Sequence, residues 1–207
     1  MLLPGSMVFA QIPAELFGGE KKATFDLMFF RYFKNSSGGS TGMLFFNRNR
    51  VSIDYKITRS TLLPQFGFTG VISWNHKKGK GFAPVLVAQV FSSGVFPKAG
   101  LQFACLRKNL TLFSWLVCEA AKEPGIDFFF PGRYIPALSE KLSLFSQMEF
   151  VNAFPTSANK SYSYTQRFRL GLKIKEFQFG TGTEITETGR NKFMVTTNSG
   201  GFLRYEF

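Results

Sequence analysis

The stretch that decides the fold is residues 162–174, which read YSYTQRFRLGLKI. Mostly apolar side chains occupy every second position from Tyr162 to Ile174, and the positions between them hold Ser, Thr, Arg, Gly and Lys. A period of two places these two sets on opposite faces of a β-strand, whereas a helix would mix them. We therefore predict a strand with one apolar face and one polar, cationic face.

The same alternation recurs at 51–58, 142–150 and 193–207. Short polar or glycine-bearing segments between such runs are typical of hairpin connections. We place eleven of them, at 35–41, 48–49, 59–65, 77–81, 92–96, 108–109, 122–125, 137–140, 154–160, 174–176 and 188–191. Eleven connections predict twelve antiparallel strands; ten strands are the alternative, because 42–58 is ambiguous and the alternation is weaker over 82–121. No segment predicts a helix longer than one turn.

The apolar face is too large to serve as an ordinary core. The chain holds 27 Phe, six Tyr and two Trp among 207 residues, and a barrel of about twelve strands is wider than one whose interior side chains just fill. No stretch reaches the eighteen or so apolar residues of a membrane-spanning helix. Lipid around a closed barrel would cover the apolar face, and closure pairs every backbone group, as the bilayer core requires. We predict an all-β fold, an antiparallel up-and-down transmembrane β-barrel.

The lengths of the connections agree with this fold. Tight and longer connections alternate along the chain, which is typical of an up-and-down barrel with two unlike ends. The tight ones are 107–109, 138–140 and 173–176, and the longer ones are 35–41, 59–65 and 154–160.

The first residues predict export. Residues 1–10 end in Val8-Phe9-Ala10, a short apolar run with small or aliphatic residues where a signal peptidase would cleave before Gln11. We interpret 1–10 as the remnant of a secretory signal peptide that has lost its basic start. The alternative is an unstructured apolar N-terminus. Residues 11–21 are then an N-terminal segment, and 22–207 form a single β-barrel domain.

The last strand carries the most specific motif. Residues 201–207 read GFLRYEF and end the chain on Phe207, with apolar residues at every second position before it. In this the chain resembles the outer-membrane β-barrel proteins of Gram-negative bacteria. The resemblance implies an outer-membrane location and a terminal strand that the barrel-assembly machinery recognises through Leu203, Tyr205 and Phe207. Twelve strands and the stretch 181–184, TGTE, also resemble the nucleoside-specific channel family.

The charge indicates anionic partners. Lys and Arg number 25 against 13 Asp and Glu, a formal net charge of +12, and a basic balance favours nucleic acid or an anionic membrane surface. A nucleic-acid surface would combine cations and aromatic rings on one face. Here they alternate, which excludes that partner. The basic turns at 77–80 and 107–108 would instead contact head groups of the bilayer or lipopolysaccharide.

If the apolar sets face lipid, the alternate charged residues face the lumen. These are Asp26, Asp54, Lys56, Arg133, Glu149, Arg167, Arg169, Glu184 and Arg204. Rings of Arg and Lys line anion-selective pores, so the interior could be a narrow path that favours anions. The alternative is that arginines and carboxylates pair across the lumen and plug it.

The scarcity of histidine and cysteine argues against an enzyme. The only histidine, His76, lies in a predicted basic turn, and there are only two cysteines, so we expect no catalytic triad, no metal site and no cofactor. We predict a passive channel or transporter for a small anionic or polar solute. Two alternatives stay open: a plugged barrel that serves as a structural or assembly subunit of a membrane complex, and a soluble β-barrel that binds an apolar ligand.

Overall fold

A computed structural model describes residues 12–55, 65–91, 93–119 and 125–207. They form a closed barrel in which each strand pairs antiparallel with the next, and the last strand pairs with the first. Its strands are β1 (Pro13–Gly19), β2 (Lys22–Lys34), β3 (Ser40–Asp54), β4 (Gln65–Trp74), β5 (Phe82–Phe91), β6 (Gly94–Leu106), β7 (Leu110–Glu119), β8 (Gly125–Tyr134), β9 (Leu142–Pro155), β10 (Tyr162–Ile174), β11 (Phe177–Gly189) and β12 (Phe193–Glu206). The fold class and the count of twelve strands are confirmed.

The predicted count is right because two errors cancel: one strand was divided by a turn that is not there, and another strand was missed. The connection expected at 48–49 is wrong, because these residues lie inside β3. Their polar character looks like a turn, but Arg48 points into the barrel while Asn49 donates to Asn47 on the outer face. The strand β1 was not foreseen. It lies within the segment 11–21, so the barrel begins before residue 22. The signal-peptide remnant proposed at 1–10 lies outside the described residues.

The connections do not separate by length between the two ends. The connection 35–39, expected to be one of the long loops, lies at the same end as 107–109 and 175–176, which are short. Both described chain ends, Ile12 and Phe207, also lie at this end and bond to each other through their backbones. One short 3-10 turn, Lys77–Gly79, is found there. In the described part of the chain, helical structure of the length and apolar character needed to cross a bilayer is not found.

The outer surface of the barrel is apolar. Along β10, Arg169 is buried inside whereas Leu170 is 58% exposed, as the alternation of residues 162–174 predicts. Outward leucines on six strands each expose more than half of their surface: Leu16, Leu86, Leu101, Leu116, Leu170 and Leu203. In water such a surface would be costly. A belt of this kind is what a bilayer core covers.

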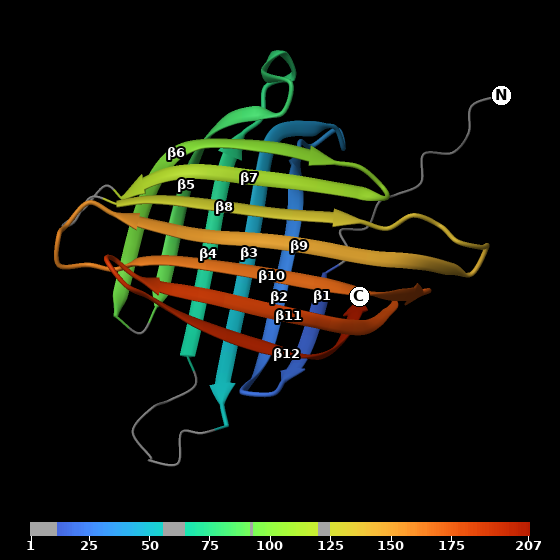
Figure 1. The fold of residues 1–207 in the computed structure, drawn as a ribbon. Coiled ribbons are helices and arrows are strands. Elements are labelled where there is room, and N and C mark those ends of the chain that lie inside the picture. Colours follow the sequence, from blue (N-terminus) through green and yellow to red (C-terminus); the bar gives the residue numbers. More distant parts are fainter. Residues whose placement is uncertain (1–11, 56–64, 92, 120–124) are drawn as a thin grey trace.

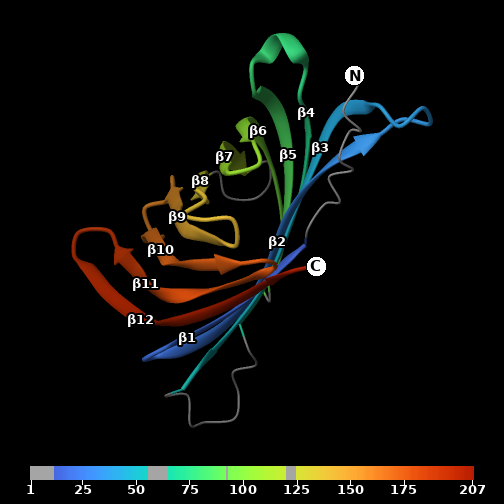
Figure 2. The same cartoon turned by 90° about the vertical axis from the view of Figure 1, so that its right-hand side faces the viewer.

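The barrel is flattened, so that its two walls touch. Figure 1 shows β2 to β5 running behind β7 to β12 and across their direction, and Figure 2 shows the two sets of strands from the side. Phe46 on β3 and Phe113 on β7 meet across the interior with ring centroids 5.3 Å apart. Elsewhere Arg48 on β3 reaches Glu149 on β9. Side chains from opposite walls therefore fill much of the interior.

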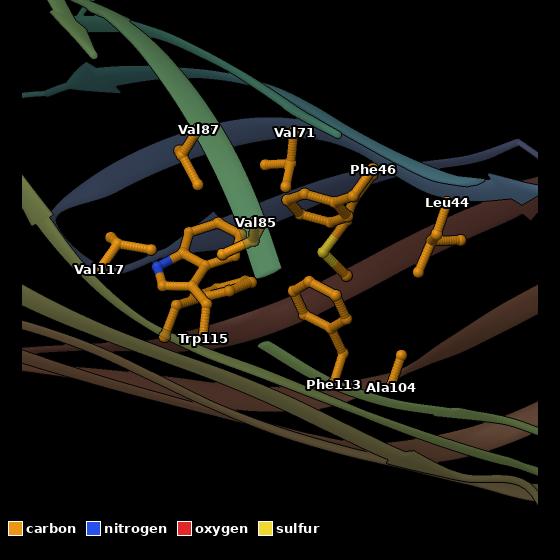
Figure 3. Close-up of a cluster of buried hydrophobic side chains, with 11 residues drawn as sticks. Leu44, Phe46, Val71, Val85, Val87, Ala104, Phe113, Trp115 and Val117 are labelled. Carbon is orange, nitrogen blue, oxygen red and sulfur yellow. The ribbon is translucent and has the colours of Figure 1, made fainter. Parts of the chain in front are cut away.

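Half of this interior is apolar, which the sequence reasoning did not foresee. Eleven buried side chains from β2 to β8 form one cluster (Figure 3). Its members are Met28, Leu44, Phe46, Val71, Val85, Val87, Ala104, Phe113, Trp115, Val117 and Phe129. We expected a barrel of about twelve strands to be too wide for side chains to fill its interior, which holds for a round barrel. In the flattened barrel the walls lie close enough for their side chains to meet. It also explains the weak alternation over 82–121: in β5, Val85 and Val87 face inward while Leu86 between them faces outward.

Candidate functional site

The rest of the interior holds a charged network together with a smaller apolar cluster of Phe17, Phe145 and Phe202. Alternation along β1 to β3 and β8 to β12 directs the charged side chains inward, where they form ion pairs. The cations are Lys22, Arg48, Arg50, Arg133, Arg167, Arg169, Lys173 and Arg204, and the carboxylates are Glu15, Asp26, Glu149, Glu184 and Glu206. The network so defined has three more cations than carboxylates.

Glu149 ties the two walls of the barrel together. Its carboxylate accepts a hydrogen bond of 2.8 Å from Arg48 Nη1 on the opposite wall and another from Arg167 on the neighbouring strand β10. Arg48 in turn donates from Nε to Asp26 Oδ1 at 3.0 Å. Glu149 is 1% exposed, and a buried carboxylate is tolerated only when cations and donors surround it, as they do here.

Glu184 has the densest cationic surroundings. Arg50 Nη2 lies 2.6 Å and Arg169 Nη2 2.9 Å from its Oε1 atom. Arg167 Nε lies 3.6 Å from Oε1, and Lys22 Nζ lies 3.3 Å from Oε2. One carboxylate therefore faces four cations, so its charge does not neutralise the positive character of this region.

A glycine makes room for one of these arginines. Arg169 is paired in register with Gly182 on β11, and a Cβ atom at 182 would lie 2.6 Å from Arg169 Cδ. The guanidinium can therefore lie over the ring of Phe17, 3.8 Å from its centroid, while Nε donates to Glu15 Oε1 at 3.1 Å. Arg204 reaches the same Glu15 at 3.7 Å. Stacking and pairing together hold Arg169 in one position.

The network continues toward the end of the barrel that holds the chain ends. Lys173 pairs with Glu206, and Arg133 Nη1 lies 4.0 Å from the same carboxylate. Gln147 accepts hydrogen bonds from both Arg133 (3.1 Å) and Arg204 (2.9 Å). Among the described residues Glu206 pairs with two cations, whereas Glu184 pairs with four.

Two interior cavities lie on either side of the network. The first, which we call the vestibule, has a volume of about 370 Å³, and its lining includes Lys22, Arg48, Arg50 and Arg167. The second, the terminal cavity, has about 170 Å³, and its lining includes Arg133, Lys173 and Glu206. A larger hollow of about 640 Å³ lies on the outer apolar face, where side chains such as Leu112, Met148, Phe168 and Leu170 line it. Because this hollow faces outward, the vestibule and the terminal cavity are the candidate solute sites.

Most residues proposed for the lumen meet in the network. Asp26, Arg133, Glu149, Arg167, Arg169, Glu184 and Arg204 all belong to it. Asp54 is exposed at the end of β3 and lies outside the network, and Lys56 lies outside the described residues. The role of all nine residues in solute passage stays a prediction. Among the described residues no group of three or more His, Cys, Asp or Glu side chains could hold a metal ion.

Sequence reasoning missed six members of the network. They are Glu15, Lys22, Arg48, Arg50, Lys173 and Glu206. Lys173 and Glu206 share the inward face of β10 and β12 with residues that were named, so alternation alone could have found them. Because a turn was wrongly predicted at 48–49, Arg48 and Arg50 were not assigned to the inward face of a strand. Glu15 lies in strand β1, which was not predicted.

The comparisons with known proteins agree with the fold. No protein-family model and no curated protein matches the sequence. Among solved structures the chain is similar to the KdgM porin, with 16% sequence identity, a TM-score of 0.52, and coverage of 95% of this chain and 99% of that chain. It is also similar to the NanC porin, with 8% identity, a TM-score of 0.52, and coverage of 96% and 100%. The chain therefore has the twelve-stranded barrel fold that the KdgM and NanC porins share.

Proposed function

We propose that the protein is an outer-membrane channel that passes small anionic solutes in preference to cations. The observation that carries this proposal is the composition of the vestibule. Its described lining holds four cationic side chains, Lys22, Arg48, Arg50 and Arg167, and no carboxylate. Clustered Arg and Lys attract anions into a pore and repel cations.

The fold and the outer surface support the proposed location. The apolar belt suits a bilayer, and the likeness to two porins supports a channel rather than an enzyme. The KdgM porin has also been solved in complex with disordered oligogalacturonate, which supports an acidic solute here. We further propose that the terminal strand, with Leu203, Tyr205 and Phe207, is the segment that the barrel-assembly machinery recognises. Lysines in the turns would contact lipopolysaccharide.

A plugged barrel is the second candidate, and the network itself favours it. Ion pairs such as Arg48 with Glu149 cross the interior between the vestibule and the terminal cavity. A barrel held shut in this way would serve as a structural or assembly subunit of a membrane complex. The two candidates differ in one measurable property, because only the channel conducts ions.

Planar bilayer recordings test the proposal. Purified protein under a KCl gradient should give a reversal potential that shows preference for Cl⁻ over K⁺. The double variant Arg167→Ser, Arg169→Ser should lower this preference, because it removes two cations of the network. The variant Lys141→Ser is the matched control, since it removes an exposed cation before β9. Absence of conductance would favour the plugged barrel, and unchanged selectivity in the double variant would contradict the role of these arginines.

A further inference from the structure

The vestibule has two chemically different walls. The cationic wall of this cavity is formed by Arg48, Arg50 and Arg167, and the aromatic wall by the rings of Phe46, Trp115 and Phe129. Each of these two walls is a part of the cavity lining and not a side of the barrel, and polar side chains such as Thr69, Gln89 and Thr165 complete the lining. The walls meet where the guanidinium of Arg48 lies 5.8 Å from the centroid of the Phe129 ring. A solute in this cavity would therefore touch cations on one side and aromatic rings on the other.

The aromatic wall is a fixed surface. Trp115 packs on Phe129 with ring centroids 4.5 Å apart, and Phe46 lies 5.6 Å from Trp115 in an edge-on arrangement. All three side chains are less than 5% exposed, and Figure 3 shows Phe46 and Trp115 among the other members of the apolar cluster. The rings pack against one another and against the rest of the apolar cluster, so their positions do not depend on a ligand.

Two donors at this cavity have no hydrogen-bond partner within the described residues. The indole nitrogen of Trp115 is buried and unpartnered, and Figure 3 shows it turned toward Val117. Nε of Arg167 also makes no hydrogen bond there, although it lies 3.6 Å from Glu184 Oε1 in an ion pair. Buried donors without partners are uncommon and call for a bound group or water. Both belong to residues that line the vestibule.

We propose that the vestibule binds aromatic carboxylates, that is, small anions that contain both a carboxylate and an aromatic ring. This inference rests on the proposed function, because the solute must enter the barrel. The carboxylate would accept hydrogen bonds from the arginine wall, and the ring would pack against Trp115 and Phe129. A volume of about 370 Å³ falls within the range of known small-molecule sites.

A carboxylated sugar fits this cavity less well. Its ring carries hydroxyl groups on both faces and edges, and each one loses water when it enters. Polar side chains such as Gln65, Thr69 and Gln89 also line the cavity, but the side chains of Phe46, Phe129 and Val151 offer no hydrogen bond. A hydroxyl turned toward these apolar side chains would therefore lose its water without compensation and weaken binding. An unsubstituted aromatic ring has no hydroxyl groups to dehydrate, so it enters the cavity without this loss of hydrogen bonds.

The chain contains a fluorescent probe for this test. Its two tryptophans are Trp115 at the vestibule and Trp74, which is 65% exposed on the outer face. The variant Trp74→Phe leaves Trp115 as the single tryptophan. Titration of this variant in detergent with phenylacetate, galacturonate or 2-phenylethanol then compares an aryl anion with a sugar anion of equal charge and with an uncharged aryl compound.

We expect saturable quenching by phenylacetate, with a Kd at least about tenfold lower than that of either other compound. Arg48→Met on this background should weaken phenylacetate binding about tenfold, and each of its carboxylate partners keeps another cation, Arg50 for Asp26 and Arg167 for Glu149. Lys192→Met, at an exposed turn, is the matched control and should change nothing. If Arg48→Met fails to fold, Phe129→Leu offers a smaller change that should also weaken binding.

Three outcomes would overturn the inference: no quenching by phenylacetate, equal affinity for galacturonate, or equal affinity for 2-phenylethanol. The first means that no aryl site exists, the second that the rings do not discriminate, and the third that the cations do not hold the carboxylate. Each is distinguishable from failure of the proposed function, which is read from the Cl⁻ preference in KCl alone. Anion selectivity with no phenylacetate binding would refute only the inference.

Discussion

Neutralising Glu184 should both destabilise the barrel and strengthen its preference for anions. Its carboxylate lies within 3.6 Å of Arg50, Arg167 and Arg169 and 3.3 Å from Lys22, and it is 1% exposed. The change Glu184→Gln keeps the size and shape of the side chain. It removes one negative charge, so the excess of cations in the network rises from three to four.

The expected loss of stability follows from the partners that remain. Arg50 keeps Asp26, Arg167 keeps Glu149 and Arg169 keeps Glu15, so the change leaves no buried arginine of this group without a carboxylate. Breaking a buried ion pair by removing one partner costs about 3–5 kcal/mol, and we expect the lower end, about 3 kcal/mol. With a dependence on urea of about 3 kcal/mol per molar, the unfolding midpoint should fall by about 1 M.

Two assays check this prediction. Urea unfolding in detergent, followed by the loss of the fast-migrating band on unboiled gels, gives the midpoint, and the reversal potential under a KCl gradient gives the selectivity. The double variant Glu184→Gln, Lys22→Met is the matched control. It returns the excess of cations to three and should recover part of the stability. A single variant with an unchanged midpoint and an unchanged reversal potential would refute the reasoning that this carboxylate holds the network together.

Two further predictions concern the outer surface and the last strand. Leu170→Arg places a charge on the exposed apolar face of β10 and should destabilise the barrel by about 2–4 kcal/mol near the middle of a bilayer. The heat-shifted band of folded barrel on detergent gels should therefore be weaker in this variant. An undiminished band would contradict the lipid-facing assignment. Removal of Phe207, whose backbone bonds to Ile12, should lower the amount of protein in the outer-membrane fraction, and an unchanged yield would show that assembly does not depend on this residue.

Alternation predicted the fold because exposed apolar side chains recur on the outer face of many strands, while the inward side chains of several strands are polar. In β10 the inward residues are polar, so Arg167 and Arg169 stand out against Phe168 and Leu170, and one stretch of sequence shows both faces. The closing strand pair was not predictable in the same way. β1 has only seven residues and ends in two glycines, and its pairing with β12 joins segments almost the whole chain apart.

The apolar half of the interior could not be read from the sequence. Where both faces are apolar, a period of two disappears, as around Val85, Leu86 and Val87. The partners within the charged network were also hidden. Arg48 and Glu149 are 101 residues apart and meet only because the flattened barrel brings β3 against β9. Alternation tells which residues point inward; the shape of the barrel decides which of them touch.

The two halves of the interior contribute unequally to stability, and this bears on what the charges are for. Burying one large apolar side chain contributes about 1.5–3 kcal/mol, so the eleven residues of the apolar cluster suffice to hold the walls together. A buried ion pair contributes little beyond the cost of removing its charges from water, and well-packed apolar residues often replace it without loss. The excess of cations in the network adds repulsion as well. A barrel optimised for stability alone would therefore extend the apolar cluster across the whole interior. The cations that line the vestibule beside the rings of Phe46, Trp115 and Phe129 are the groups that the solute proposed above would need.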